Sequence, residues 1–333
     1  MHMADALLSP AVGGTMYAVS AGAVGYAARR IQKEGLAEQK LPLMAVSGSF
    51  VFAAQMINFT IPATGSSGHI CGGILLAGLL GGEPALLSLA AVLIIQCLLF
   101  ADGGLLALGA NIFNMGVIPC LIVYPLLMRP FLKKGMSAKR ITVVSVLSCV
   151  IGLQLGAFSV VLETLASGVT ELPFTTFVSL MQPIHLAIGF VEGLITAGVL
   201  SYVYRMRPEI LESAASQKKM PVSVSIGRTV VTLAVLAVLV GGGLSLFASS
   251  NPDGLEWAME HTAGTTELER EGGVYETAAG IQESTSLLPD YDFAAGEGTG
   301  TSASGLIGAA VTAGLAAGAG AVLTVTRRKR REA

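Results

Sequence analysis

The chain has 333 residues, of which 53% are hydrophobic and only 13% are charged, and its formal net charge is −2. Soluble domains carry about a quarter charged residues, so this composition argues against a soluble domain and predicts an all-α integral membrane protein. A single Trp, 6% aromatic residues and no mixed basic and aromatic runs give no support to nucleic-acid binding.

Nine apolar runs follow one another along the chain, and eight of them are long enough to cross about 30 Å of hydrocarbon. Seven precede residue 205 and two follow it. The third is only marginally long enough, and its Gly-Gly pairs mark it as a place where irregular backbone can line an internal cavity. The runs lie at residues 10–28, 41–60, 69–82, 84–101, 110–128, 141–165, 184–204, 229–248 and 304–326.

Basic residues predict the orientation of these runs. Nineteen of the 20 Lys and Arg residues fall into four clusters, at residues 29–40, 129–140, 205–228 and 327–331. The positive-inside rule assigns all four clusters to the cytoplasm. We therefore expect a multi-pass protein of the plasma (inner) membrane, with its N-terminus outside and its C-terminus in the cytoplasm. This alternation requires that the third run also crosses the membrane.

The distribution of polar residues predicts three parts. Residues 1–205 form a transmembrane bundle, residues 206–228 a polar, basic cytoplasmic linker, and residues 229–333 an extension of two membrane helices. The extension encloses residues 249–303, which contain eleven acidic residues and many Gly, Ser and Thr. Such a segment is a poor core former, so we predict a solvated outer loop that is flexible at least in part. The alternative is an acidic antenna that concentrates cations.

The first ten residues, Met-His-Met-Ala-Asp-Ala-Leu-Leu-Ser-Pro, lack the basic and apolar regions of a cleavable signal. His2 directly follows the amino group of the chain. The Met1 amine, the His2 amide nitrogen and the His2 imidazole can therefore form two fused chelate rings around one metal ion, with three nitrogens in a plane. The alternative is an exposed terminal histidine without a role.

His69 is the candidate for a fourth nitrogen. It lies in residues 60–73, where a proline and several glycines break the helix, and on the same predicted side of the membrane as His2. Four planar nitrogens are diagnostic of Ni(II) or Cu(II). Three neighbouring hydroxyl groups are candidates to orient the His69 ring, those of Thr64, Ser66 and Ser67.

The same stretch permits an enzymatic interpretation. Residues 65–68 fit the GxSG pattern of intramembrane serine proteases, in which Ser67 would be the nucleophile and His185 its base. Four residues of common types are a weak signal in a chain with 41 glycines. We therefore rank the protease below the metal site.

Four more polar residues lie in apolar surroundings. Asn111 and Asn114, at the outer start of the fifth run, either cap a helix, bind another loop or line the metal cavity. His185 and Glu192 are seven residues apart and share one helix face. Ionisable residues inside a membrane are functional candidates, so this pair is interpreted as a helix-packing or partner-docking pair or as metal ligands.

Together these motifs resemble the NikM/CbiM family, the substrate-binding membrane components of energy-coupling-factor importers for nickel and cobalt. The resemblance covers residues 1 to about 204. It rests on the first ten residues, on TGSSGHICGG around His69, on GANIFNMG at 109–116 and on HLAIGFVEGLITA at 185–197. Residues 229–326 look like the fused NikN-type or PDGLE-type extension, through the motif Pro-Asp-Gly-Leu-Glu at 252–256.

The resemblance implies a seven-helix substrate-binding bundle with an extra N-terminal helix, to which two C-terminal transmembrane helices are added. It implies that the N-terminal segment enters the bundle and binds metal through Met1, His2 and a later histidine, here His69. It also implies a transmembrane coupling subunit and cytoplasmic ATPases as partners. The chain has no Walker A motif, so ATP hydrolysis is expected in the partners.

We therefore predict a nickel-binding transport component in the lipid bilayer, with Ni(II) as its substrate and no organic cofactor. Met-Ala-Asp-Ala at residues 3–6 differs from the Ile-Pro-Asp-Gly of many cobalt-type relatives and favours nickel. A cobalt importer component is the alternative within the class. The serine protease, and a metal-gated channel or sensor, are the alternatives from other classes.

Overall fold

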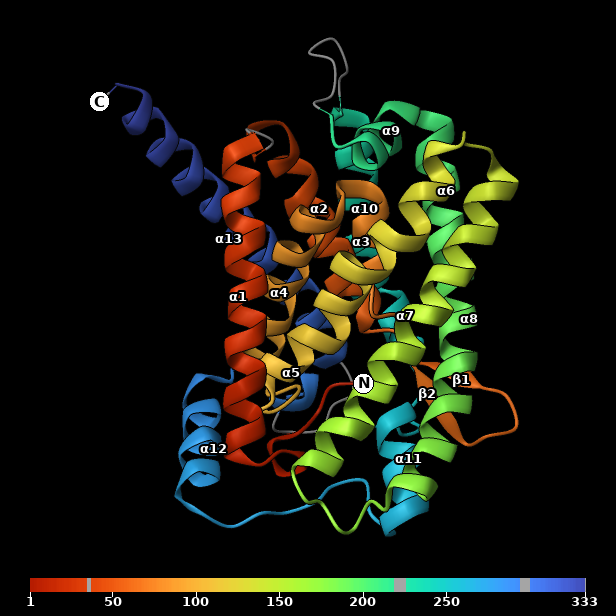
Figure 1. Ribbon diagram of the computed structural model, residues 1–333, viewed down its shortest axis with the longest axis vertical. Helices are drawn as coiled ribbons and strands as arrows, with labels where there is room; N and C mark the ends of the chain where they lie inside the picture. Colours follow the sequence, from red (N-terminus) through yellow and green to blue (C-terminus); the bar gives the residue numbers. More distant parts are fainter. Residues whose placement is uncertain (35–36, 219–225, 294–299, 333) are drawn as a thin grey trace.

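The computed structural model describes residues 1–34, 37–218, 226–293 and 300–332. Helices dominate this part of the chain, with one two-stranded antiparallel sheet among them (Figure 1). Up to residue 216 the elements are η1 (Asp5–Leu7), α1 (Pro10–Glu34), α2 (Ala37–Gln55), β1 (Phe59–Ile61), β2 (Ser66–Gly68), α3 (Gly73–Leu80), α4 (Gly82–Phe100), α5 (Leu108–Ile112), the π-helical η2 (Phe113–Met128), α6 (Arg129–Lys133), α7 (Ala138–Ala166), α8 (Phe174–Met206) and α9 (Pro208–Ser216). The remaining elements are α10 (Gly227–Gly242), η3 (Leu244–Phe247), α11 (Gly254–Ala263), α12 (Gly273–Thr285), η4 (Pro289–Tyr291) and α13 (Gly300–Glu332).

Each of the nine predicted apolar runs overlaps a helix. Among the described residues, four helical stretches are long and apolar enough to cross a membrane, Gly82–Phe100, Leu108–Lys133, Ala138–Ala166 and Phe174–Met206. The chain is thus a multi-pass membrane protein. The third run forms α3, whose eight residues extend only about 12 Å at 1.5 Å per residue. Because α3 alone cannot cross a bilayer, the count of nine spans stays a prediction.

The short helix α3 begins inside the protein, and all eight of its residues are buried. Just before it, the N–H groups of Cys71 and Gly72 donate to the two carboxylate oxygens of Glu192 on α8, each at 2.9 Å. Backbone groups at membrane depth must find partners within the protein. Glu192 is therefore a helix-packing residue here, and it holds the start of α3 against α8.

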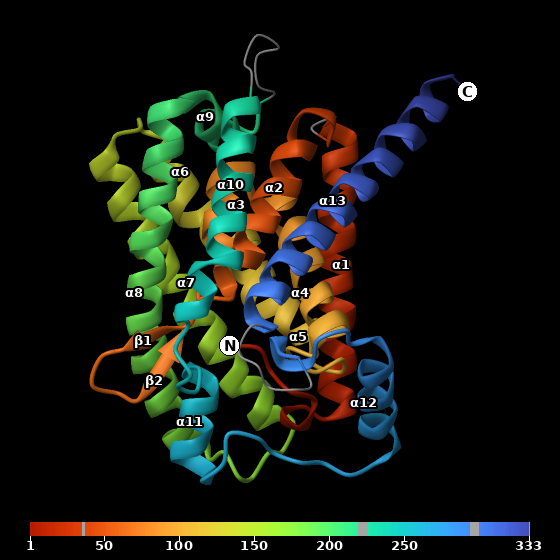
Figure 2. The same cartoon turned by 180° about the vertical axis from the view of Figure 1, so that it is seen from behind.

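The end of the bundle and its extension are packed together. α9 occupies the first half of the predicted linker and buries Ile210 and Leu211, packing against α3 and α8; residues 219–225 lie outside the described part. α10 and α13 both pack against α2 and lie in front of the bundle in Figure 2, which shows the side opposite to Figure 1. The extension thus shares an interface with the bundle.

The acidic segment 249–303 contains packed helices, which the prediction of a partly flexible loop did not specify. Among its described residues, α11 packs against α8 and β2, and α12 packs against α4. The reason is a buried apolar face on α11, formed by Leu255, Ala258 and Met259, at helical spacing. The high acidic content concealed this spacing, so the sequence did not predict these helices.

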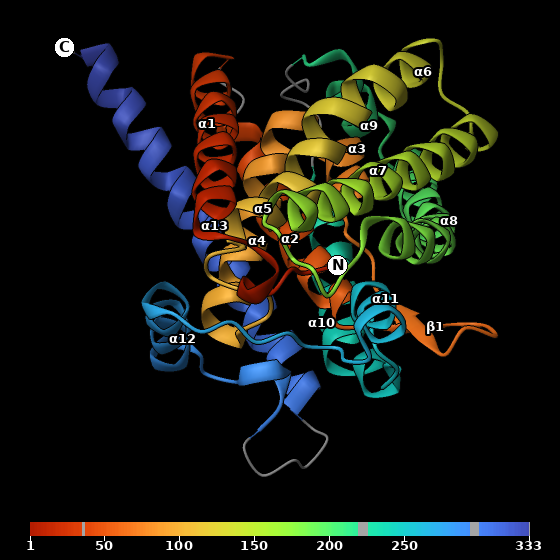
Figure 3. The ribbon, with the colours of Figure 1, turned by 60° about the horizontal axis from the view of Figure 1, so that its bottom comes forward.

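Opposite ends of the molecule carry opposite charge. The elements that hold or border the basic clusters, namely the end of α1, α6, the end of α8 next to α9, and the C-terminus, lie at the top of Figure 1. α11 and α12 of the acidic segment lie at the bottom. Seen from that end, the N-terminus lies toward the middle of the molecule, with α11 and α12 on either side of it (Figure 3).

Candidate metal-binding site

The N-terminal segment lies inside the protein. Met1 is 5% exposed and Met3 is fully buried. Asn111 holds the backbone of Met3 at two points, because its Oδ1 accepts the Met3 N–H at 2.8 Å and its Nδ2 donates to the Met3 carbonyl at 3.2 Å. The Gly104 N–H donates to the same carbonyl at 2.9 Å. Amide hydrogen bonds from the bundle therefore position the first three residues.

Asn114 lies beside the same segment. Its Nδ2 is 3.7 Å from the Met3 sulfur and donates to Glu163 Oε2 at 2.8 Å. The sequence offered three roles for the two asparagines. The structure shows both of them in contact with another segment, the N-terminal one. Both also lie within the wall that surrounds the chain terminus.

The terminal amine meets a carboxylate and an imidazole. The Met1 nitrogen is 2.5 Å from Asp253 Oδ2 and 3.4 Å from His69 Nε2. Burial disfavours the charged form of both ionic groups. The Asp253 charge nevertheless raises the pKa of the amine, and the ammonium holds the pKa of Asp253 below its ordinary value. A buried ion pair therefore links the first residue to the PDGLE motif.

Asp253 performs a second task at the start of α11. Its Oδ1 accepts the N–H groups of Leu255 at 2.7 Å and Glu256 at 2.9 Å, while Glu256 Oε2 accepts the Asp253 N–H at 2.9 Å. This is a capping box. It occupies one carboxylate oxygen and leaves Oδ2 for the Met1 amine. One side chain thus begins a helix and binds the chain terminus.

The neighbouring motif residues seat α11 on the bundle. The Pro252 carbonyl accepts the N–H of Ser67 in β2 at 2.8 Å. A methyl group added at Gly254 would come within 2.8 Å of Ile188 and 3.2 Å of the His185 ring. The absence of a side chain at Gly254 thus permits the close approach of α11 to α8 without a shift of these two neighbours.

His2 lies between two partners and a second ring. Its Nε2 is 3.2 Å from Gln96 Oε1 and its Nδ1 is 3.1 Å from Asp102 Oδ1. Burial and the nearby Met1 ammonium lower the pKa of His2 to about 3, so the ring is neutral at pH 7. Because the Gln96 oxygen can only accept, Nε2 carries the proton and Nδ1 carries the lone pair. Burial also raises the pKa of Asp102, the carboxyl beside that nitrogen.

His69 lies directly against His2, with ring centroids 5.3 Å apart and an interplanar angle of 17°. Its Nδ1 is 3.0 Å from the Ile70 carbonyl, which can only accept. Nδ1 therefore carries the proton and Nε2 presents its lone pair toward the Met1 amine. A backbone carbonyl that selects the tautomer in this way is typical of metal-binding histidines.

The three hydroxyl groups that were candidates to orient His69 bind elsewhere. Thr64 Oγ1 donates to the Ile61 carbonyl at 2.8 Å, Ser66 Oγ to the Ser67 carbonyl at 3.0 Å, and Ser67 Oγ to the Asn251 carbonyl at 2.8 Å. The hairpin of β1 and β2 turns its serines toward residues 251–252. The Ile70 carbonyl takes the orienting role instead.

The protease pairing is also not formed in this structure. The Ser67 hydroxyl donates to backbone carbonyls of residues 251 and 252. The His185 Nδ1 is bonded to the Met181 carbonyl at 2.8 Å. A nucleophile and its base need a mutual hydrogen bond, and the hydrogen bonds of the described residues do not include one between these two.

His185 faces the site from α8. With Met1, His69, Cys71 and Asp253, it lines a void of about 10 Å³, close to the space that one small ion or water requires. Because its Nδ1 donates to Met181, the Nε2 lone pair of His185 is unprotonated. Its partner in the sequence prediction, Glu192, binds the backbone before α3 and does not join it.

Two larger cavities reach His2 from the acidic end. One of about 430 Å³ and one of about 540 Å³ share four lining residues, His2, Asp102, Glu256 and Asp290. Their negative walls attract cations. The site is therefore buried yet open to ions from the side that carries α11 and α12.

Sequence reasoning missed three residues of this site, Gln96, Asp102 and Asp253. A signal for Asp253 was present, because Asp-x-x-Glu at 253–256 is a capping-box pattern that predicts a helix start. No local pattern marks Gln96 or Asp102. Within the described part of the chain, no group of three His, Cys, Asp or Glu side chains is arranged to hold a metal.

Two family models match the chain. Residues 2–210 match the cobalt uptake substrate-specific transmembrane region, and residues 227–325 match the PDGLE domain. The two matches leave out the stretch 211–226, which contains most of the predicted linker.

Relatives with the same two parts are named as metal transport proteins. A fused nickel transport protein NikMN of Archaeoglobus fulgidus is 31% identical over 87% of this chain and 88% of its own length. A fused nickel transport protein LarMN of Lactiplantibacillus plantarum is 30% identical over 78% and 79%. A crystal structure of a truncated transition metal transporter is 31% identical, with a TM-score of 0.54, covering 62% of this chain and 99% of that one.

Proposed function

Because this chain belongs to the family of cobalt uptake substrate-specific transmembrane regions, with a PDGLE domain following, we propose that it is the nickel-binding membrane component of an ATP-driven importer. Metal transport is the function given to its relatives. The proposal specifies the ligands, the metal and the partners.

The proposed ligands are the Met1 amine, the His2 amide nitrogen, the His2 imidazole and the His69 imidazole. The observation that supports this set is the buried convergence of the chain terminus with two neutral rings, with the amine 3.4 Å from His69 Nε2. Each ring has a neutral tautomer with a lone pair on the required nitrogen. Forming the chelate requires the His2 ring to leave Asp102 and the amine to leave Asp253.

The proposed metal is Ni(II). A set of four nitrogens in a plane suits Ni(II) or Cu(II) and rejects zinc, which prefers a tetrahedron. Two fused relatives are named as nickel transport proteins, which supports the same choice. A cobalt transport protein of Methanocaldococcus jannaschii, 30% identical over 63% of this chain, keeps cobalt as the alternative.

The proposed partners are a transmembrane coupling subunit and cytoplasmic ATPases. The chain lacks a Walker A motif, so the nucleotide chemistry is assigned to other subunits. We propose that the acidic end, with α11 and α12, faces outside and that the basic end faces the cytoplasm. The positive-inside rule supports this orientation.

The experiment is metal analysis of the full chain purified with its native N-terminus, in wild-type form and as His2→Ala. Wild-type protein should bind one Ni(II) per chain with the yellow absorption of planar Ni(II), and His2→Ala should lose both. A single Ala inserted before Met1 should have the same effect, because it moves the amine away from the imidazole. His261→Ala is the matched control, since His261 is exposed and bonded to Trp257.

The fourth ligand is tested separately. His69→Ala should weaken nickel binding without abolishing it, and His185→Ala should weaken it less. A stronger loss in His185→Ala would replace His69 by His185 in the ligand set. Unchanged binding in both the inserted variant and His2→Ala would overturn the terminal chelate altogether.

A further inference from the structure

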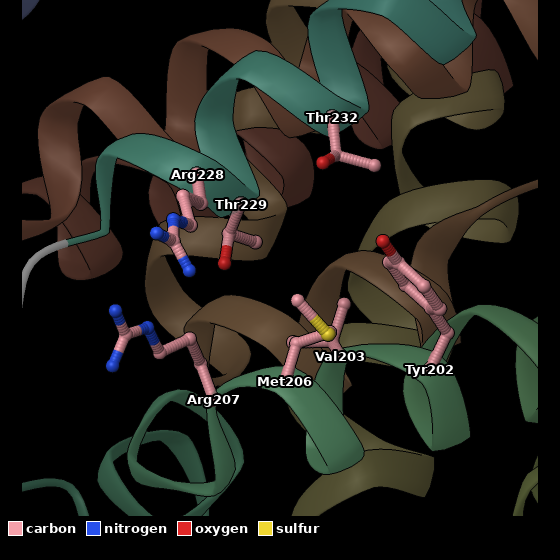
Figure 4. A pocket seen from close by; sticks show the side chains of 7 residues that line it. All are labelled: Tyr202, Val203, Met206, Arg207, Arg228, Thr229 and Thr232. Carbon is pink, nitrogen blue, oxygen red and sulfur yellow. The ribbon is translucent and has the colours of Figure 1, made fainter.

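A second cleft lies at the basic end of the molecule, far from the N-terminal segment along the chain. It has a volume of about 150 Å³ and separates the C-terminal end of α8 from the first turns of α10 (Figure 4). The first wall belongs to the cobalt-uptake region and the second to the PDGLE domain. The lining residues are Tyr202, Val203, Met206, Arg207, Arg228, Thr229 and Thr232.

Two arginines face this cleft from opposite walls. Arg207 from the end of α8 and Arg228 from α10 direct their guanidinium groups to the same side of the gap (Figure 4). Among the described residues, no carboxylate forms an ion pair with either of them. The stretch 219–225, which lies outside the described part, contains no Asp or Glu. Two guanidinium groups in this arrangement repel each other unless an anion lies between them.

The donors around the cleft suit a phosphate. Guanidinium groups bind phosphate oxygens through paired N–H donors. The Thr229 hydroxyl also points into the gap (Figure 4). Thr229 lies in the first turn of α10, where the positive end of the helix dipole favours an anion.

The surroundings of the cleft suit a phosphate that belongs to a lipid. Met206 ends the membrane-crossing stretch of α8, so Arg207 and Arg228 lie at the depth of lipid headgroups. Beyond the arginines, α10 exposes apolar side chains, with Val231 62% and Val238 58% exposed. On the facing helix, Tyr202 is 46% exposed. These surfaces offer an acyl chain a path that leads away from the charged end.

We propose that this cleft binds the phosphodiester headgroup of an anionic glycerophospholipid in the leaflet next to the basic clusters. Arg207 and Arg228 bind the phosphate, Thr229 donates to it, and the acyl chains lie along α8 and α10. The bound lipid bridges the two domains at the end opposite the metal site. The proposal is independent of the identity of the transported metal.

The test measures lipid retained by the purified full chain after mild detergent exchange, with native mass spectrometry as the readout. Wild-type protein should retain phosphatidylglycerol in preference to phosphatidylcholine. Arg207→Gln and Arg228→Gln should each reduce phosphatidylglycerol binding about fivefold, since one basic residue contributes about 1 kcal/mol near an anionic surface. Arg205→Gln is the matched control, because Arg205 is exposed, adjacent and outside the cleft.

Four outcomes decide the proposal. Loss in both cleft variants, with retention in Arg205→Gln, supports it. Equal retention of phosphatidylglycerol and phosphatidylcholine by wild-type protein overturns it, as does equal loss in all three variants. Displacement of the bound lipid by millimolar inorganic phosphate would make the cleft a site for free phosphate and overturn the lipid assignment. Nickel content of the cleft variants should match wild type, which shows that they are folded.

Discussion

The N-terminal segment is held from two sides, and the two sides use different chemistry. The bundle holds the backbone of Met3 through neutral amide hydrogen bonds from Asn111 and Gly104. The PDGLE domain holds the Met1 amine through the charge of Asp253. The first side determines where the segment lies, and the second determines the electrostatics of the amine.

This difference indicates a division of labour. A backbone clamp is insensitive to the state of the ligands, so it can keep the segment in place with and without metal. A carboxylate beside the amine compensates positive charge, whether that charge is an ammonium or a metal. The following variants separate the two sides, from the largest expected effect to the smallest.

Gly104→Ala should have the largest effect, because it disturbs the contacts by which the bundle holds the N-terminal segment. An added methyl group would collide with the side chain and the backbone nitrogen of Asp5. Backbone cannot yield as a flexible side chain can, so the segment should leave its position and nickel affinity should fall at least about 100-fold, a cost at the upper end of overpacking. Equilibrium dialysis of nickel measures the change.

Gly22→Ala on α1 is the control for that variant, because an added methyl group there meets no atom within 4 Å. Its nickel affinity should equal wild type. If Gly104→Ala also binds normally, the clamp is not needed for the site.

Asp253→Asn should reduce nickel affinity by about tenfold, within the range of 10–100-fold seen for residues that support metal ligands. Asn retains N-cap ability, so α11 should remain folded while the charge beside the amine is lost. Glu260→Gln, at an exposed position in the same acidic segment, controls for the change in net charge. Equal effects of the two variants would show that Asp253 acts only through the net charge of this end and not through its contact with the amine.

Glu192→Gln tests a region away from both sides. One amide oxygen cannot replace two carboxylate oxygens for the N–H groups of Cys71 and Gly72. One buried donor then lacks a partner, at a cost of about 1–3 kcal/mol. We expect a lower thermal midpoint in detergent, with a smaller change in nickel affinity than in Asp253→Asn. A fall in affinity without a fall in midpoint would contradict the packing role.

Ser67→Ala should have the smallest effect. It removes one hydroxyl donor to the Asn251 carbonyl, which contributes about 1 kcal/mol. The Ser67 hydroxyl does not contact His69, so the loss of this one hydrogen bond should leave nickel affinity within about twofold of wild type. Labelling of wild-type protein by a fluorophosphonate probe, lost in Ser67→Ala, would instead support the interpretation of the protein as a serine protease.

Composition and local patterns were sufficient for the membrane class, the family and the candidate ligands. Each predicted apolar run overlaps a helix, because a long apolar segment in a membrane must satisfy its backbone hydrogen bonds internally and a helix does so. His2 and His69 could be selected because a histidine behind the terminal amine and a histidine in a helix-breaking stretch have local signatures. The seven-plus-two span count and the ligand roles remain predictions.

Contacts between distant residues were decided only by the tertiary structure. The ion pair of Met1 with Asp253 joins residues 252 positions apart, and no local pattern specifies which acidic residue of residues 249–303 reaches the amine. The packed helices α11 and α12 were missed for a related reason, since their apolar faces acquire meaning only against α8 and α4. Sequence periodicity specifies which face of a helix is buried, whereas the partner of that face depends on how the whole chain packs.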